Sequence, residues 1–233
     1  MRLRWKTPMR DERRRWLRGA AVAALAVHMA WLRQSLAAGQ VEKGVARVRG
    51  DARINGVPAK EGMDVKAGDI VTTGPASEIV FVAGRDAFLV RSNSRVEAQG
   101  TAGALLLSGL RIVTGAVLSV FSRGEPKTLS TSTATIGIRG TGVYVEAEEA
   151  RTYICTCYGE AEIESAADPS ARETVRTTHH EQPRYVMGMG SPQMLMGAPV
   201  INHTDAELIL LEGLTGRRPP FLDQPDYRPG GGY

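Results

Sequence analysis

The chain has 233 residues, a formal net charge of +4 and only two cysteines. Its positive charge is concentrated at the N-terminus, where residues 1–37 hold nine Lys or Arg residues against Asp11 and Glu12. That segment has a net charge of +7, so the rest of the chain carries −3. The rest therefore lacks the basic excess typical of nucleic-acid-binding proteins, and we expect no nucleic-acid partner.

The N-terminal segment has the features of an export signal. Residues 13–18 (RRRWLR) place paired arginines before an aromatic residue and a leucine, the order of a twin-arginine signal. Residues 19–32 form a mostly apolar run, which is too short for a membrane span of about 20 residues. Residues 35–37 (SLA) suit cleavage by a signal peptidase. We predict a cleavable signal over residues 1–37, periplasmic localisation and no stable membrane span after cleavage. An ordinary secretory signal is the alternative to the twin-arginine route.

Residues 44–142 indicate an all-β fold. Short segments with strand-forming patterns alternate with turn residues at intervals of about ten residues. Asn55-Gly56 predicts a tight hairpin, because both central positions of a type I′ turn need positive φ. The apolar run at residues 79–82 predicts a strand that is covered on both faces. This pattern is typical of a β-roll, a β-sandwich or a short β-solenoid of many short strands.

Residues 133–145 (TATIGIRGTGVYV) predict two strand segments joined by a bend. Apolar and polar residues alternate up to Arg139, as in a half-buried strand. Gly140 and Gly142 interrupt the alternation where the backbone bends or approaches another backbone closely, and strand-forming residues then resume.

The same stretch closely resembles the signature of the FecR family, T-A-x-I-G-[VI]-R-G-T followed by an aromatic residue and a valine. Residues 68–74 (GDIVTTG) are similar to a second landmark of that family, a G-D-x-I-x-T-G turn. The resemblance covers about residues 44–165. It implies a periplasmic all-β module of a family named for regulators that relay an outer-membrane signal to a cytoplasmic sigma factor.

One feature departs from those regulators. They carry a sigma-factor-binding segment of many tens of residues before their membrane span, whereas here only 18 residues precede the apolar run. The expected role is therefore sensing, signalling or scaffolding in the envelope, with an envelope protein as partner. No Ser-His-Asp arrangement, phosphate-binding loop or carboxylate pair is recognisable, and we expect a non-enzymatic protein.

The two cysteines and two adjacent histidines predict a metal site. In an extended segment Cys155 and Cys157 point to the same face. Residues 160–174 look like a hairpin that returns His179 and His180 towards the cysteines. Adjacent strand residues face opposite ways, so both histidines reach one ion only if the backbone turns there. Two thiolates with one or two imidazoles form a ligand set for zinc or copper(I).

The methionines and the cysteines of this region each have other interpretations, which stay open. Four methionines within residues 187–196 favour copper, although methionine often serves only in flexible packing. The Cys-x-Cys pair also fits a periplasmic thiol–disulfide redox protein, or a purely structural envelope protein in which the cysteines form a staple.

The C-terminal region predicts one helix and a tail. Thr204 and Glu207 have the spacing of a capping box at a helix start, and His203 just before it is a weaker candidate ligand. The helix would dock on the β domain or on a partner. Its apolar stripe has Ile209, Leu210 and Leu214 at the centre and Leu208 and Leu211 at the edges. Residues 217–221 and 225–233 are rich in proline and glycine and are expected to be extended or disordered.

These features divide the chain into four predicted segments. They are an export signal at 1–37, a FecR-like β domain at 38–165, a β extension containing Cys, His and Met residues at 166–203, and a capped helix with a Pro/Gly-rich tail at 204–233.

Overall fold

The computed structural model describes residues 43–228. They form one mixed sheet of fourteen strands, and α2 is the α-helix of this part of the chain, so the predicted all-β fold with a C-terminal helix is confirmed. The elements are β1 (Gly44–Arg49), β2 (Ala52–Ile54), β3 (Val57–Pro58), β4 (Ile70–Thr73), β5 (Glu78–Ala83), β6 (Asp86–Val90), β7 (Arg95–Gln99), β8 (Gly109–Val120), β9 (Lys127–Ser130), β10 (Ala134–Ala147), β11 (Arg151–Ser165), β12 (Arg172–Thr177), β13 (Arg184–Met187), β14 (Leu195–Gly197), α2 (Asp205–Leu214) and the 3-10 helix η1 (Pro220–Asp223).

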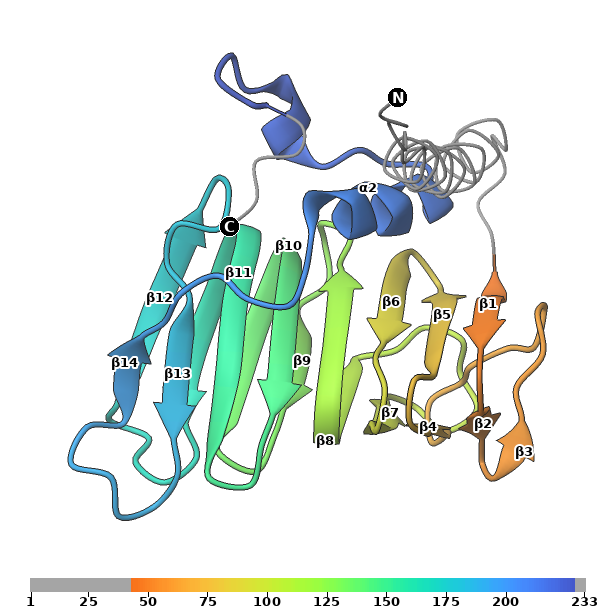
Figure 1. Cartoon of the computed structure of the whole chain (residues 1–233), viewed down its shortest axis with the longest axis horizontal. Helices are drawn as coiled ribbons and strands as arrows, with labels where there is room; N and C mark the ends of the chain where they lie inside the picture. Colours follow the sequence, from red (N-terminus) through yellow and green to blue (C-terminus); the bar gives the residue numbers. More distant parts are fainter. Residues whose placement is uncertain (1–42, 229–233) are drawn as a thin grey trace, which may run out of the picture. The chain divides into compact units, whose positions relative to one another are not determined.

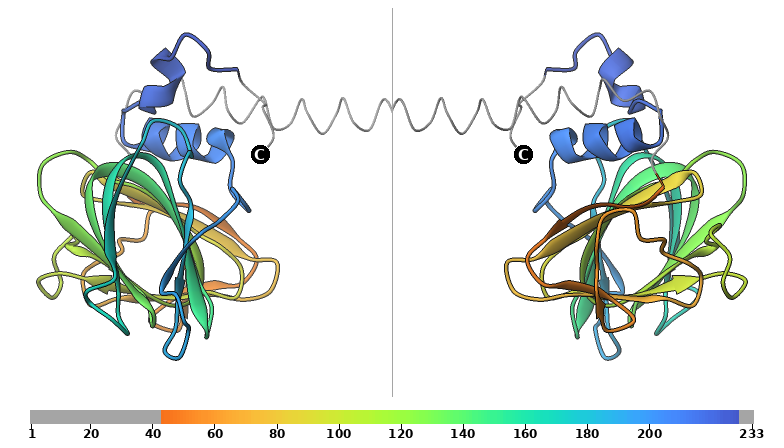
Figure 2. Two further views of the ribbon diagram at one scale, coloured as in Figure 1. Left: turned by 90° about the vertical axis from the view of Figure 1, so that its left-hand side faces the viewer. Right: turned by 90° about the vertical axis from the view of Figure 1, so that its right-hand side faces the viewer.

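The long strands β8 and β11 change partners along their length. The first part of β8 pairs with β7 and, in parallel, with β9, whereas its second part pairs with β6 and β10. β11 pairs along its length with β10, and on its other edge first with β13 and then with β12. Because long strands join two sets of shorter ones, the sheet rolls around its inner face (Figure 1, Figure 2). The end strands of the described sheet, β14 and β3, do not pair with each other, so the roll is open.

The two local predictions for the β region differ in outcome. The hairpin between β2 and β3 is confirmed, since Asn55 has φ +52° and Gly56 has φ +80°. From residue 134 onwards the stretch 133–145 belongs to one continuous strand, β10, instead of two. Its bend lies within the strand, where the pairing with β11 shifts register between Arg139 and Gly142.

The sheet has two apolar cores. The inner core lies inside the roll, and the outer core lies between the opposite face of the sheet and the C-terminal segment. In β5, Ile79 and Phe81 belong to the inner core, whereas Val80 and Val82 belong to the outer one. The prediction of a strand covered on both faces is therefore confirmed. The outer core is the layer in which the candidate site lies.

α2 covers the outer face of β6 and β8 (Figure 1). Its capping box is present, because the Thr204 hydroxyl accepts from the amide of Glu207 and the Glu207 carboxylate accepts from the amide of Thr204. The predicted centre of its apolar stripe is right for Leu214, which is buried in the outer core, and wrong for Ile209 and Leu210. The fully buried leucines are Leu208 and Leu211, one helical turn apart, and Ile209 and Leu210 lie at the partly exposed margin.

The segment after α2 also differs from its prediction. Of the residues 217–221 predicted to be extended or disordered, Pro220 and Phe221 lie in the 3-10 helix η1. The cause is Phe221, which is buried in the outer core and packs edge-on against Tyr158. Residues 166–203 supply β12, β13 and β14, which continue the same sheet.

The predicted export signal at residues 1–37 lies outside the described residues. Within residues 43–228, no helix has the length and apolar character needed to cross a lipid bilayer.

Candidate metal centre

The two thiols lie side by side on the outer face of β11. Cys155 and Cys157 are both 0% exposed and belong to the outer core. Neither forms a disulfide. Their two-residue spacing in a strand places both sulfurs on one face, as the sequence predicts.

The β11–β12 hairpin brings His180 to the cysteines. β12 ends at Thr177, opposite Gly159, and the chain then turns so that the amide of His180 donates to the carbonyl of Cys157 at 2.9 Å. His180 adopts φ +60°, a backbone conformation that is uncommon outside glycine. This turn directs the His180 ring into the outer core, where its Nδ1 lies 3.4 Å from Cys155 Sγ.

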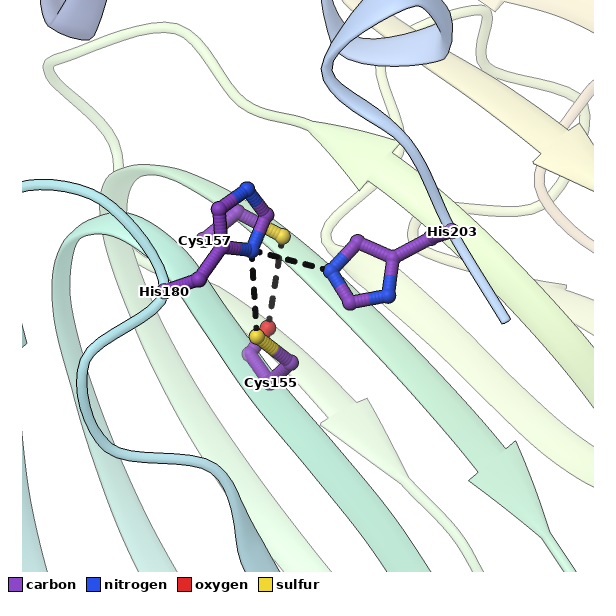
Figure 3. A group of neighbouring side chains, drawn as sticks. All are labelled: Cys155, Cys157, His180 and His203. Carbon is purple, nitrogen blue, oxygen red and sulfur yellow. Dashed lines mark hydrogen bonds between the residues drawn. The ribbon is translucent and has the colours of Figure 1, made fainter. Parts of the chain in front are cut away.

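The fourth member of the group is His203, from the segment that leads into α2. Its ring stacks on Tyr144 with centroids 4.7 Å apart. Its Nε2 lies 3.0 Å from Nδ1 of His180, which is 23 residues earlier in the chain. The ligand atoms of Cys155, Cys157, His180 and His203 all lie within 4.8 Å of one another, and all four residues are buried (Figure 3).

His179 lies outside this group of four. Its Nε2 is 2.9 Å from a carboxylate oxygen of Asp205, the first residue of α2, and its ring packs against Phe221. A carboxylate oxygen of Asp205 also lies 3.2 Å from Nε2 of His180. His179, His180 and Asp205 therefore form a second, adjoining group. Of the four predicted ligands, the structure thus places Cys155, Cys157 and His180 together with His203, and His179 apart from them.

The methionines lie elsewhere. Met187 is opposite Arg151, four positions along β11 from Cys155, which is about 13 Å at the rise of a strand. Met189, in the connection from β13 to β14, is 91% exposed. Their placement adds nothing to the choice between copper and zinc.

The charges of the group are set by burial, by its own members and by Asp205. The neighbouring Cys157 thiol, opposed by burial and assisted by His180 and His203, lowers the pKa of Cys155 to about 4. Burial raises the pKa of Cys157. Burial disfavours the charged form of His180, but Asp205 and the Cys155 thiolate outweigh it and raise the pKa of His180 to about 9. Without an ion, the group therefore contains a thiolate beside an imidazolium at neutral pH.

The hydrogen bonds of His180 and His203 leave one nitrogen of each ring, Nδ1 of His180 and Nε2 of His203, facing the other. Nδ1 of His203 lies 2.6 Å from the carbonyl of Ile201, so it carries the proton and Nε2 carries a lone pair. Nε2 of His180 faces the Asp205 carboxylate and donates to it, which leaves Nδ1 as the second lone pair of the neutral ring. Two lone pairs at 3.0 Å repel unless a proton or a cation lies between them.

This geometry suits a tetrahedral ion. Ligands around one Zn²⁺ would be separated by about 3.4 Å between two nitrogens and about 3.6 Å between sulfur and nitrogen. The observed separations are 3.0 Å and 3.4 Å. Metal-bound histidines usually donate their other N–H to a carboxylate or a backbone carbonyl, as His180 and His203 do here.

Sequence reasoning placed His203 below the other candidates and gave no role to Asp205. The signal in the sequence was their position at the start of the capped helix, because a helix that docks on the outer face of the sheet brings its first residues towards the cysteines.

Comparisons with known proteins leave the family open. No protein-family model matches the chain. No curated protein matches it either. Two crystal structures of a candidate anti-sigma factor from Parabacteroides distasonis resemble it in fold, with TM-scores of 0.45 and 0.46 at 10% and 11% identity. The matches cover 55% and 60% of this chain, and 58% and 70% of those chains. The FecR resemblance therefore remains a prediction from sequence.

Proposed function

We propose that this chain is a non-enzymatic, exported FecR-like protein that binds one Zn²⁺ or Cu⁺ ion and acts in sensing or signalling in the cell envelope. The ligands would be Cys155, Cys157, His180 and His203. The observation that supports metal binding is the orientation of the two rings, each of which places a lone pair in the group while an acceptor holds its other nitrogen.

The ligand count favours sensing or a structural role over catalysis. Catalytic zinc sites usually have three protein ligands and one open position for water or substrate. Here four buried protein ligands would complete a tetrahedral shell. An ion held in this way has no position for a substrate.

Signalling is supported by the segments that the ion would join. Cys155 and Cys157 belong to β11, His180 to the loop after β12, and His203 to the segment before α2. Metal occupancy would therefore stabilise the docking of α2 on the sheet, and metal loss would loosen it. A change in α2 is a signal that an envelope protein partner could detect.

The thiol–disulfide alternative has one observation for it and one against it. The lowered pKa of Cys155 favours a thiolate, as a redox cysteine needs. Both sulfurs are fully buried under the C-terminal segment, so the disulfide of a substrate protein cannot reach them without displacement of that segment.

Metal analysis together with a free-thiol count tests the proposal. Protein purified from the periplasm should contain about one equivalent of metal per chain, as a single four-ligand site requires. The metal should be lost in the Cys155→Ser/Cys157→Ser variant and in His203→Gln. His179→Gln is the matched control and should retain it, because His179 lies outside the group of four. Two free thiols with no metal, together with disulfide reductase activity, would support the redox alternative instead.

A further inference from the structure

A cavity of about 340 Å³ lies near the other end of α2 from the metal centre. Its walls come from the turn between β5 and β6, the loop after β8, the bends of β10 and β11, the last turn of α2 and the segment after α2. The lining residues that matter here are Arg85, Arg123, Arg217, Arg218, Phe121 and Tyr158.

The charge of this cavity is positive. Four arginines line it, and Glu212 is the one carboxylate among the lining residues. Glu212 is already engaged, since it accepts from the Tyr158 hydroxyl and from Nε of Arg217, each at 2.5 Å. Within residues 43–228, the side chains of Arg85 and Arg123 form no ion pair with a carboxylate. The cavity therefore holds cationic charge that the described protein does not neutralise.

The glycine bend of β10 creates room for one of these arginines. Gly140 has φ +59°, and a Cβ at this position would lie 2.5 Å from Cγ of Arg123. The side chain of Arg123 therefore lies directly over the β10 backbone. This gives a specific role to the bend in the 133–145 stretch, because a larger residue at 140 would displace Arg123 from the cavity.

Arg217 is held in place but not fully satisfied. Its Nε donates to Glu212 and its Nη1 donates to the carbonyl of Arg85. Its Nη2 is buried and has no hydrogen-bond partner among the described residues. A buried donor without a partner is unfavourable, and a nearby anionic oxygen would relieve it.

The cavity also has an apolar wall. Phe121 and Tyr158 both line the cavity, and each is only 3% exposed. The Phe121 ring also packs edge-on against Phe88, and the Tyr158 ring packs edge-on against Phe221. Small-molecule sites commonly have volumes of about 300–1,000 Å³, an apolar lining and a few polar groups that fix the orientation of the ligand. This cavity has such a volume, and its lining combines Phe121 and Tyr158 with four arginines.

We propose that this cavity binds a small organic anion, with its phosphate or carboxylate group on Arg85, Arg123 and Arg217 and its apolar part on Phe121 and Tyr158. Arginine suits either group because its planar fork bonds two oxygens at once. The site shares no residue with the group of four candidate metal ligands, although Tyr158 follows Cys157 directly in β11. The arginines lie near the C-terminal end of α2, whereas His203 lies just before its N-terminal end. The proposal therefore stands or falls independently of metal binding.

Titration of the purified chain with four probes tests this proposal. Inorganic phosphate offers charge alone, benzoate and phenyl phosphate offer charge with a ring, and benzyl alcohol offers the ring alone. We expect saturable binding of benzoate or phenyl phosphate, at least tenfold tighter than that of inorganic phosphate or benzyl alcohol. The tighter of the two ring-bearing anions identifies the preferred acid group. Chemical-shift changes at Gly140 and Gly159, which line the cavity, should follow the binding.

Charge-removing variants assign the binding to this cavity. Arg85→Gln/Arg123→Gln should weaken binding of the ring-bearing anion at least tenfold while the thermal midpoint stays unchanged, because both side chains are exposed. Arg218→Gln is a second variant at the rim, for which a smaller loss is expected. Arg111→Gln, on β8 and 58% exposed, is the matched control and should bind as the unmodified chain does. The proposal is overturned if no probe saturates, if benzyl alcohol binds as tightly as benzoate, or if the double variant and the Arg111→Gln control bind alike.

Discussion

At the level of single residues, the candidate metal centre depends on how protons are distributed between two histidine rings. Nδ1–H of His203 donates a hydrogen bond to a backbone carbonyl and Nε2–H of His180 donates one to Asp205. Nε2 of His203 and Nδ1 of His180 are therefore available to an ion. In the absence of an ion, a proton on His180 replaces it and is stabilised by the Cys155 thiolate. Protons and metal ions therefore compete for the same position.

This competition predicts that metal affinity rises with pH. His180, with a pKa of about 9, must lose its proton to bind an ion, and so must Cys157, whose pKa burial raises. Cys155, with a pKa of about 4, is already ionised. Between about pH 6 and 8 the affinity should increase up to about tenfold per pH unit for each proton released. Competition with a chromophoric chelator, corrected for the chelator's own protonation, measures this slope.

Asp205→Asn provides the control for that slope. It removes the carboxylate that helps to raise the pKa of His180, so less His180 is protonated near neutral pH and the slope should decrease. A metal affinity that does not change with pH would contradict the proton distribution described above.

The sequence defined part of this site and left the rest open for a physical reason. The spacing of Cys155 and Cys157 fixes their common face in any strand. The positive φ at His180 decides that His180, and not His179, joins the cysteines. The residue types around this position do not predict that backbone conformation. His203 joins the group through tertiary docking, because its segment and β11 meet only when α2 packs on the sheet.

At the level of elements, the docking of α2 depends on which of its leucines point to the sheet. The sequence pattern defined the helix and its cap but misplaced the centre of the stripe by about one position. Five apolar residues within seven positions leave the orientation of a short helix ambiguous. The sheet resolves the ambiguity, because α2 packs on β6 and β8 and buries Leu208 and Leu211 in the same outer core as Leu89 and Leu118.

Two adjacent leucines test this orientation. Leu211→Ala should lower the free energy of unfolding by about 2–5 kcal/mol, because it leaves a cavity in the outer core. Leu210→Ala makes the same chemical change at a partly exposed position and should cost less than about 1 kcal/mol. Urea unfolding of the two variants measures both values. Equal losses would mean that α2 does not dock on the face described here.

At the level of the whole β unit, the roll depends on bends inside long strands. β8 changes its partners from β7 and β9 to β6 and β10 near Gly115. The sequence predicted many short strands and turns but not this exchange, because strand pairing between distant segments leaves no local pattern. It predicted the bend in β10 because two glycines interrupt a clear alternation there, whereas Gly115 interrupts a less regular one.

Gly115 is the residue at which this bend can be tested. It has φ +84°, and an added Cβ would lie 2.1 Å from Oγ and 2.6 Å from Cα of Ser94. Gly115→Ala should therefore lower the free energy of unfolding of the β unit by at least about 2 kcal/mol, from the left-handed backbone and the contact together.

The matched control for that substitution is Gly197→Ala in β14. An added Cβ at Gly197 meets nothing within 4 Å, and its φ is not in the left-handed region. Its effect should lie within about 0.5 kcal/mol of zero. If urea unfolding gave the same small change for both variants, β8 would tolerate a side chain at the point where it changes partners. The close approach of Gly115 to Ser94 would then not be what sets the path of the roll.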